Sequence, residues 1–398
     1  MVRATILLAA LGYFVDIYDL ILFSIVRVKS LHTIGVPDTE LLSQGVLLLN
    51  MQMGGMLLGG ILWGMLGDKR GRLSVLLGSI FLYSIANIAN AFVQSVPVYA
   101  VLRLIAGIGL AGELGAGVTL VSEAMPKESR GYGTMIVATV GILGAIAAAL
   151  IGDAFDWRMA YMIGGVMGFG LLLMRIKAGE SGMFAKLKHA NTRRGTLSLI
   201  FRSPASTFKY LRCILIGMPL WFVIGILITF SPEFGKALGM AQVPSAGRAV
   251  MFSYIGLSLG GFASGSLSQI FQSRKKVSAV FMLLNVIFIL IYLFNYAPSL
   301  AVFYVTCLAL GFASGYWAVF VTIAAEQFGT NVRSTVATTV PNFVRGSVVP
   351  LTLCFQMLKA QTGIIQSAFM VACFCVIAAF IALFGLAETH GKDLDYIE

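Results

Sequence analysis

Long apolar stretches separated by short polar segments dominate this sequence. Each stretch approaches the ~20 residues that an α-helix needs to cross the hydrocarbon core of a bilayer. Twelve stretches can be marked, at residues 4–27, 42–66, 73–93, 97–122, 132–152, 157–177, 211–231, 248–270, 277–295, 298–325, 335–358 and 364–386. The pattern predicts an all-α membrane protein with twelve transmembrane helices.

The composition supports lipid as the solvent. Of the 398 residues, 58% are hydrophobic even without glycine, and only 11% are charged. Soluble domains average about 45–50% apolar residues with glycine included, and about 25% charged ones. A water-soluble core could not bury this much apolar surface, so the composition excludes a soluble protein.

The basic residues predict the orientation in the membrane. With both termini in the cytoplasm, 20 Lys and Arg residues fall on the inner side, 6 on the outer side and 2 within spans. This asymmetry follows the positive-inside rule and predicts a multi-pass protein of the bacterial inner (plasma) membrane with both termini cytoplasmic. The net charge of +11 is then a consequence of topology, and we expect no nucleic-acid partner because no basic run carries aromatic stacking partners.

Cysteine and histidine patterns exclude several classes of chemistry. The five cysteines lie in apolar stretches without C-x-x-C spacing, and the three histidines lie outside the stretches. We therefore expect no metal, no cofactor and no enzymatic activity. The first stretch is too long for a cleaved signal peptide and contains two acidic residues, so we expect it to remain as a span.

Internal repeats indicate a duplication. Span 2 carries two G-x-x-x-G pairs that recur in span 8 at an offset of 201, at Gly55, Gly59, Gly60 and Gly64 and at Gly256, Gly260, Gly261 and Gly265. Glu123 with Arg130 recurs as Glu326 with Arg333 at an offset of 203. Small residues four apart allow helices to approach closely in lipid. The repeats predict two related six-helix bundles.

The basic interval 178–209 divides six stretches from six. We therefore expect an N-terminal six-helix bundle over 1–177, a cytoplasmic linker loop over 178–209 and a C-terminal six-helix bundle over 210–398. Parallel repeats of this kind place a substrate site at the middle of the membrane between the two halves.

Five ionisable residues lie deep inside the apolar stretches, away from their ends. Asp16 and Asp19 belong to the first stretch, Arg103 and Glu113 to the fourth and Arg345 to the eleventh. An ionisable group in the bilayer marks a functional site by default. Asp19 and Arg103 lie at similar depth, which predicts that they pair. For Asp16 the alternative is a structural hydrogen bond to a neighbouring helix.

The polar segment between the second and third stretches is short, basic and rich in glycine. It reads Gly64-Met65-Leu66-Gly67-Asp68-Lys69-Arg70-Gly71-Arg72. An ordinary topology loop would require the basic residues but neither the Asp nor the glycines. The segment resembles the signature loop G-x-L-x-D-[RK]-x-G-R-[RK] of the major facilitator superfamily. The resemblance implies the major facilitator fold, in which two pseudo-symmetric six-helix bundles rock about a central cavity.

The same resemblance implies a set of gating residues. In the superfamily the loop Asp docks against the start of helix 11 and against an Arg that follows helix 4, and Asp68 and Arg130 match these two positions. We therefore expect conformational gating at the cytoplasmic face by Asp68, Arg72, Glu123, Arg130, Glu326 and Arg333.

Two families within the superfamily share motifs with this chain. The helix-4 pattern R-x-x-x-G-x-G starts at Arg103, and the following Glu-x-x-Pro-x-x-x-Arg-Gly segment looks like the sugar porters. In proton-coupled sugar porters a helix-1 Asp after Tyr pairs with this Arg, which matches Tyr18-Asp19 and Arg103. The resemblance implies proton coupling through Asp19 and Arg103. Asp16 and Glu113, the other acids within the spans, are further candidates for the coupling proton.

The second family favours acids as substrates. The run Asp16-Ile17-Tyr18-Asp19 is similar to the D-G-x-D motif of the metabolite/aromatic acid:proton symporters, with Ile17 in place of the glycine. Arg333 and Arg345 look like the two functional arginines of that family, and Glu113 matches its helix-4 carboxylate.

A substrate site is expected around Arg345, because a guanidinium near the midplane requires a counter-charge and fits a carboxylate bidentately. Aromatic residues in spans 1, 7 and 10 suit an aromatic or amphiphilic ligand, although each could instead pack against its neighbours or face lipid. The expected substrate-binding residues are Arg345, Asn342, Tyr18, Trp221, Tyr316 and Trp317.

These observations favour a proton-coupled symporter of a small organic anion that works by alternating access. Its partners would be the substrate, protons and the lipid bilayer, and it would act as a monomer. One alternative is a proton-coupled efflux transporter of amphiphilic compounds, with Asp16, Asp19 and Glu113 attracting cations. A further alternative is a non-transporting membrane sensor, which would not need the proton pair.

Overall fold

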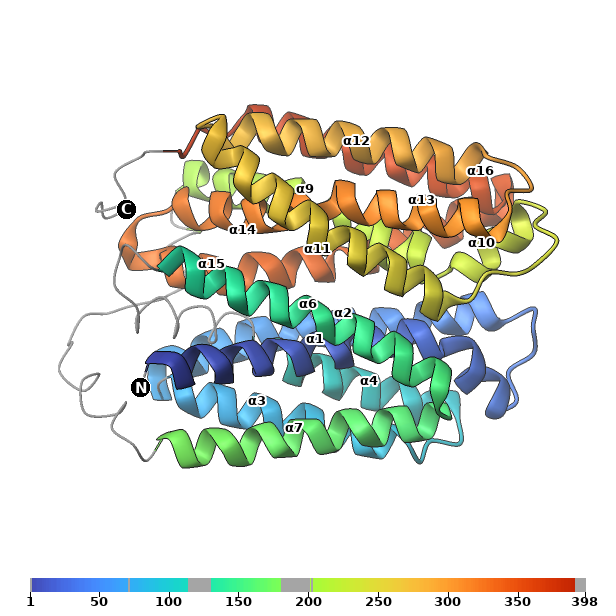
Figure 1. The fold of residues 1–398 in the computed structure, drawn as a ribbon, viewed down its shortest axis with the longest axis horizontal. Helices are drawn as coiled ribbons and strands as arrows, with labels where there is room; N and C mark the ends of the chain where they lie inside the picture. Colours follow the sequence, from blue (N-terminus) through green and yellow to red (C-terminus); the bar gives the residue numbers. More distant parts are fainter. Residues whose placement is uncertain (1, 71, 114–129, 180–200, 202, 391–398) are drawn as a thin grey trace.

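A computed structural model describes residues 2–70, 72–113, 130–179, 201 and 203–390, and all regular elements within these ranges are helical (Figure 1). The first group of helices comprises α1 (Val2–Thr33), α2 (Leu41–Arg70), α3 (Arg72–Asn90), α4 (Val96–Leu110), α6 (Arg130–Ala154) and α7 (Trp157–Gly179). The second comprises α9 (Pro204–Phe222), α10 (Ser231–Ala237), α11 (Ala246–Ile270), α12 (Arg274–Phe294), α13 (Leu300–Ala313), α14 (Trp317–Glu326), α15 (Thr330–Gly346) and α16 (Val348–Phe384).

The helices account for the predicted spans. Eight are long and apolar enough to cross a membrane, and three shorter apolar helices accompany them at Ser74–Asn90, Val96–Leu110 and Val140–Ala154. The last of the eight covers 50 residues, which would reach ~75 Å as one straight helix and so exceeds the bilayer. It contains two spans, because the backbone of Gly363 leaves the helical region at φ 82° and ψ 172°.

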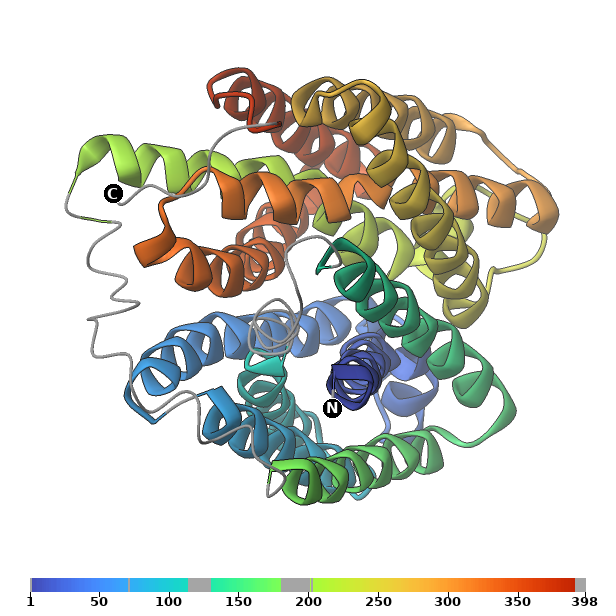
Figure 2. The same cartoon turned by 60° about the vertical axis from the view of Figure 1, so that its left-hand side comes forward.

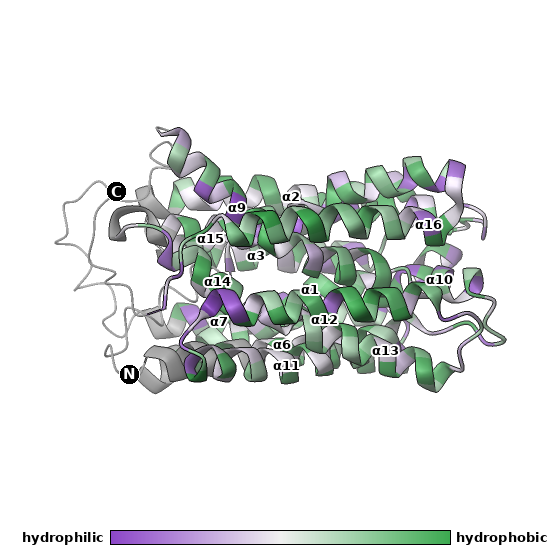
Figure 3. Ribbon diagram, turned by 90° about the horizontal axis from the view of Figure 1, so that it is seen from above, coloured by the Kyte–Doolittle hydropathy of each residue, from purple (hydrophilic) through white to green (hydrophobic). Residues whose placement is uncertain are grey.

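Hydrophobic residues predominate along most of the length of the helices (Figure 3). Phe262 is 71% exposed and Phe374 is 60% exposed, among many large apolar side chains on the surface of the helices. In water such a surface would drive aggregation, whereas lipid solvates it. The predicted all-α membrane fold is confirmed.

The two groups of helices lie side by side with their axes roughly aligned (Figures 1 and 2). We call the end at which α1 begins and α16 ends the terminal end, and the opposite end, where α1 ends and α2 begins, the far end. The predicted linker 178–209 falls largely outside the described residues, so the proposed domain boundaries stay a prediction.

Glycine contacts confirm that the same helix packing occurs twice. Gly55 and Gly59 of α2 lie against the carbonyl oxygens of Leu104 and Ile108 in α4, and a Cβ at either glycine would overlap these atoms. In the second group, Gly256 and Gly260 of α11 lie in the same way against Leu308 and Phe312 of α13. Backbones approach this closely only where a side chain is absent.

The remaining glycines of the repeat do not have this role. Among the described residues, no atom outside the helix's own backbone lies within 4 Å of the Cβ position at Gly64 or Gly265. Gly60 faces Asn342 of α15 instead, and therefore belongs to the contact between the two groups.

Two helices of the second group are interrupted in their apolar interiors. A π-helix at Val223–Ile228 continues α9, and a 3₁₀ turn at Ser314–Tyr316 joins α13 to α14. Pro219 precedes the π-helix and cannot donate its backbone nitrogen to the helix ladder. Such interruptions are frequent at functional sites.

The segment after α16 is tied to the start of α12 at the terminal end. The carboxylate of Glu388 accepts hydrogen bonds from the Ser273 hydroxyl and from the backbone nitrogens of Arg274 and Lys275. Burial alone would raise the pKa of Glu388, but these hydrogen bonds lower it to about 2. Glu388 therefore stays ionised at neutral pH and caps the N-terminus of α12, where negative charge is favourable.

Candidate functional site

An acid of the first group faces a base of the second group at the centre of the molecule. The Asp16 Oδ2 atom of α1 lies 4.0 Å from the Arg345 Nη1 atom of α15, and both side chains are almost fully buried. Neither oxygen of Asp16, nor Nε or Nη1 of Arg345, has a hydrogen-bond partner among the described residues. The pair is too far apart for a direct hydrogen bond.

Aromatic side chains surround the guanidinium of Arg345. Its central carbon lies 5.8 Å from the ring centroid of Trp221 in α9, within the range of a cation–π contact. Trp221 is buried, and its indole nitrogen has no hydrogen-bond partner among the described residues. Tyr13 and Tyr254 lie within electrostatic reach of Arg345 from α1 and α11. The site thus combines one cation, one carboxylate and aromatic faces.

The predicted pairing of Asp19 with Arg103 is wrong for this structure. Arg103 of α4 donates to the side-chain oxygen of Gln52 in α2 and, at 3.5 Å, to the hydroxyl of Tyr161 in α7. Its guanidinium also stacks 4.8 Å from the ring of Phe23. Equal depth did not bring the two charges together, because depth along a helix does not specify the face from which a side chain projects.

Asp19 is buried without a direct partner. Neither of its carboxylate oxygens has a hydrogen-bond partner, and Asp19 forms no ion pair with any described residue within 4.0 Å. Its carboxylate packs against the Cα of Gly164 in α7, where a larger residue would overlap it.

Glu113 has a partner that sequence reasoning missed. Arg175 of α7 forms a two-pronged ion pair with Glu113, and both side chains are at least 95% buried. A Cβ at Gly12 of α1 would overlap this pair, so the glycine provides its space. Glu113 therefore pairs with Arg175 and not with the buried Arg345 of the second group. Arg175 was overlooked because it lies near the end of a span and was counted as a residue of the inner loop.

Three of the other predicted substrate residues form hydrogen bonds to the backbone. Asn342 lies one turn before Arg345 and donates to the carbonyl of Ala111, at 3.0 Å, across the two groups. The hydroxyl of Tyr18 donates to Ala160, and that of Tyr316 donates to Ile216. Trp317 is half-buried beside Phe320. The structure thus gathers Arg345, Asn342 and Trp221, whereas Tyr18 and Tyr316 fasten helices within their own groups.

Most of the predicted gating residues cannot be placed. Glu123 lies outside the described residues, and nothing is described of the side chains of Asp68, Arg72, Arg130 and Arg333. Glu326 forms a bidentate ion pair with Arg274 of α12, at 2.6 and 2.8 Å. The gating role of these residues stays a prediction.

A second buried ion pair joins the two groups toward the far end. Arg27 of α1 contacts Glu233 of α10 at 2.7 Å and lies 4.6 Å from the ring of Phe230. One turn earlier in α1, Ser24 accepts a hydrogen bond from Thr229 at 3.0 Å. Arg27 is the last residue of the first predicted span, and the sequence placed it among the basic residues of the outer side. The helix continues to Thr33 and buries the side chain.

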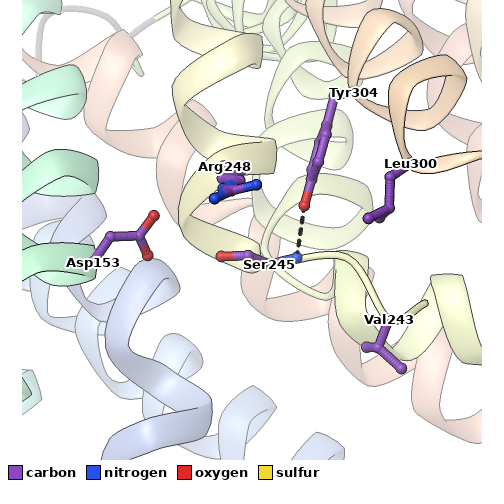
Figure 4. A pocket seen from close by; sticks show the side chains of 6 residues that line it. All are labelled: Asp153, Val243, Ser245, Arg248, Leu300 and Tyr304. Carbon is purple, nitrogen blue, oxygen red and sulfur yellow. Dashed lines mark hydrogen bonds between the residues drawn. The ribbon is translucent and has the colours of Figure 1, made fainter.

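A pocket opens at the far end of the seam between α6 and α11 (Figure 4). It has a volume of about 360 Å³ and is lined by Asp153, Val243, Ser245, Arg248, Leu300 and Tyr304. Asp153 reaches it from the first group, and Gly247 at the start of α11 leaves room for this carboxylate. None of the predicted substrate residues lines this pocket.

The comparisons with known proteins agree with this architecture. The family model described as Major Facilitator Superfamily matches residues 9–351. The chain belongs to the major facilitator superfamily. It is therefore an integral membrane protein with several spans and a transporter, not an enzyme, and its substrate is a small organic molecule.

Individual relatives carry more specific names. The putative niacin/nicotinamide transporter NiaP of Bacillus subtilis is 26% identical over 353 residues, which cover 86% of each chain. The 3-(3-hydroxy-phenyl)propionate transporter of Escherichia coli is 31% identical over 239 residues, or 57% of each chain. A solved structure of a D-xylose-proton symporter aligns with a TM-score of 0.76 at 18% identity, covering 98% of this chain and 99% of that one.

The Arg27–Glu233 pair predicts a measurable barrier to opening at the far end. In the Glu233→Gln variant Arg27 is left without its counter-charge, and breaking a buried ion pair on one side costs about 3–5 kcal/mol. With the native cysteines replaced by serine and Thr229→Cys as reporter, we expect Glu233→Gln to raise labelling by an impermeant maleimide at least about ten-fold.

The control for this experiment is Glu40→Gln, which alters an exposed carboxylate at the same end of the protein. It should leave labelling of the reporter cysteine unchanged. Equal labelling in the Glu233→Gln variant and its parent would show that the ion pair does not hold the far end closed.

Proposed function

We propose that this transporter is a proton-coupled symporter of a small organic anion, with Arg345 as the anion receptor. The observation that carries the proposal is the incomplete coordination of Arg345. Its guanidinium is buried between the two groups of helices, and its nearest counter-charge, Asp16, lies 4.0 Å away. A carboxylate could accept two parallel hydrogen bonds from this guanidinium, which Asp16 does not do in this arrangement.

Asp16 stabilises the positive charge of Arg345 when no substrate is bound. An isolated guanidinium in the bilayer is costly, and a carboxylate at this distance offsets part of that cost. A bound anion would take over this role. Asp16 would then either move away from Arg345 or bind a proton. Because α1 and α15 belong to different groups of helices, this exchange of partners would be coupled to their relative movement.

Asp19 is the proposed site of the coupling proton. Its carboxylate is buried with no hydrogen bond from any described residue, so its neutral form suits this environment better than its ionised form. Arg103 is occupied by Gln52 and Tyr161 in the same arrangement. Movement of Arg103 from Gln52 to Asp19 would favour release of the proton, which gives the pair its role as a switch.

An aromatic acid is the preferred substrate class. The face of Trp221 beside Arg345 can stack on an aromatic ring whose carboxylate binds the guanidinium. One relative is named for niacin and nicotinamide, and another for 3-(3-hydroxy-phenyl)propionate. Niacin and 3-(3-hydroxy-phenyl)propionate are aromatic carboxylic acids. We place the terminal end in the cytoplasm, the protein in a bacterial inner membrane and its functional form as a monomer.

The proposal is tested by uptake into proteoliposomes with an alkaline interior. The panel contains nicotinate, 3-(3-hydroxyphenyl)propionate, neutral nicotinamide and xylose. We expect at least one of the two acids to accumulate, and a protonophore to abolish this accumulation. Failure of both acids to accumulate, or equal accumulation of nicotinamide or xylose, would overturn the proposal. Loss of a preloaded amphiphilic cation in exchange for protons would instead support efflux.

A further inference from the structure

One face of α3 carries polar side chains that have no partners. Tyr83, Asn87 and Asn90 follow one another at spacings of four and three residues, which places them on the same side of the helix. All three are fully buried. The hydroxyl of Tyr83 and both polar atoms of each amide have no hydrogen-bond partner among the described residues. Buried amides in this condition are rare, and they are a common setting for internal water.

These side chains border Asp19. The amide of Asn87 faces the Asp19 carboxylate without forming a hydrogen bond to it. Gly164 and Gly168, one turn apart in α7, lie against Asp19 and against the ring of Tyr83. The two side chains therefore flank the same face of α7.

The row of polar groups continues toward the terminal end. Tyr83 lies within electrostatic reach of both Asp19 and Glu113. Arg175, which pairs with Glu113, is two turns beyond Gly168 in α7. We call the row Asn90, Asn87, Asp19 and Tyr83 the polar column. It begins at the last residue of α3 at the far end, and its other end lies within electrostatic reach of the Glu113–Arg175 ion pair.

The duplicated helix shows that packing does not require these amides. α12 begins 202 residues after α3, at Arg274 and Arg72 respectively. At this offset Ile289 and Tyr292 replace Asn87 and Asn90, and the hydroxyl of Tyr292 donates to Leu227. The position of Tyr83 is taken by Asn285, whose amide donates to Ser314.

The comparison of α3 with α12 shows that the polar column occurs in the group of helices that contains the buried acids. The first group of helices contains Asp16, Asp19 and Glu113 in its interior, and its version of this helix carries the unpartnered amides. Of the corresponding positions in the second group, Ile289 is apolar and the Tyr292 hydroxyl has a hydrogen-bond partner. Asn285 is bonded through its amide nitrogen, and only its Oδ1 atom has no partner among the described residues.

We propose that the polar column is a water-holding path through which Asp19 exchanges its proton with the solution at the far end, separately from the substrate site at Arg345. The inference rests on the proposed role of Asp19 as the proton site. Asparagine amides both donate and accept hydrogen bonds but do not titrate, so they can orient a chain of water molecules without trapping the proton. The Glu113–Arg175 pair closes the other end, because each group satisfies the other.

Infrared spectroscopy of the full chain in bilayers tests this path without a substrate. The probe is D₂O, and the signal is the shift of the carbonyl band of protonated Asp19, which Asp19→Asn identifies by removing it. We expect Asn87→Leu and Asn90→Leu each to slow this exchange at least about ten-fold. Each substitution removes roughly one hydrogen bond to the water chain, and a loss of this size raises the barrier to proton exchange by about the corresponding amount. Asn87→Gln keeps the hydrogen-bonding groups and should exchange within a few-fold of the parent.

The matched control is Asn285→Leu, the same substitution at a buried asparagine of the duplicated helix. It should leave the exchange rate unchanged, which separates the path from general effects on stability. Exchange at the parental rate in both α3 leucine variants would overturn the path while leaving the proton role of Asp19 intact. The absence of any band removed by Asp19→Asn would instead overturn that role, and the path with it.

Discussion

The Asp19→Asn variant is expected to lose accumulation driven by a pH gradient and to retain exchange of substrate across the membrane. Asparagine resembles a permanently protonated aspartate, because it is neutral and of similar size. The variant can therefore pass through the substrate-loaded steps of the cycle. It cannot release a proton, so the gradient no longer drives net movement.

The expected loss of accumulation follows from the number of protons transported with each anion. With one proton per anion, a gradient of one pH unit supports about ten-fold accumulation, because one unit corresponds to about 1.4 kcal/mol. The measured accumulation ratio in Asp19→Asn proteoliposomes should fall to about one. Counterflow of labelled against unlabelled acid, from the panel described above, should persist within a few-fold of the parental rate.

Asp38→Asn provides the control for this experiment, since Asp38 is an exposed residue at the far end. It should accumulate substrate as the parent does. If Asp19→Asn still concentrates substrate against the gradient, Asp19 does not carry the coupling proton, and Asp16 is the next residue to replace. Loss of both accumulation and counterflow, in a variant that remains folded, would assign Asp19 to substrate binding instead.

The architecture was predictable because lipid imposes strong constraints on sequence. Span length, glycine spacing and the Asp68 segment are enough to identify the fold and the duplication from the sequence alone. Gly55 and Gly256 illustrate the reason: a glycine is required wherever two backbones touch, and this requirement recurs at the same place in both halves. Gly64 matched the spacing equally well but has no close neighbour in the part of the chain that the structure describes, so spacing alone did not identify the contacts.

The ion pairs were harder to predict, because the position of a residue within an apolar stretch specifies its depth in the membrane but not the direction in which its side chain projects. Asp19 and Arg103 lie at similar depth, yet Arg103 projects toward Gln52 on a third helix. Arg27 and Arg175 were counted with the loops, and both are buried in ion pairs. Their partners lie more than 60 residues away in sequence, so only the packing of helices could identify them.

The Arg345→Lys variant is expected to bind the substrate anion roughly ten- to a hundred-fold more weakly than the parent. Lysine keeps the positive charge and the attraction to Asp16, so the site retains its electrostatic balance. It loses the planar fork that can hold both oxygens of one carboxylate. The loss corresponds to about 1.5–3 kcal/mol, the range for a hydrogen bond to a charged group.

Calorimetry on the purified protein measures this change directly, with the acid that the uptake panel identifies. Arg212→Lys is the matched control, because Arg212 donates to the carbonyl of Gly385 within the second group, outside the proposed site. It should bind as the parent does. Unchanged affinity in Arg345→Lys would remove Arg345 from the binding site and make its contact with Asp16 purely structural.

A second substitution separates direct binding from competition at the same site. If Asp16 and the substrate share the guanidinium of Arg345, Asp16→Asn should tighten binding of the anion, because the neutral amide competes less well for the cation. In the double variant Asp16→Asn/Arg345→Lys this gain should shrink, since the two residues act on one another. Additive effects of the two substitutions would mean that Asp16 and the substrate do not compete for Arg345.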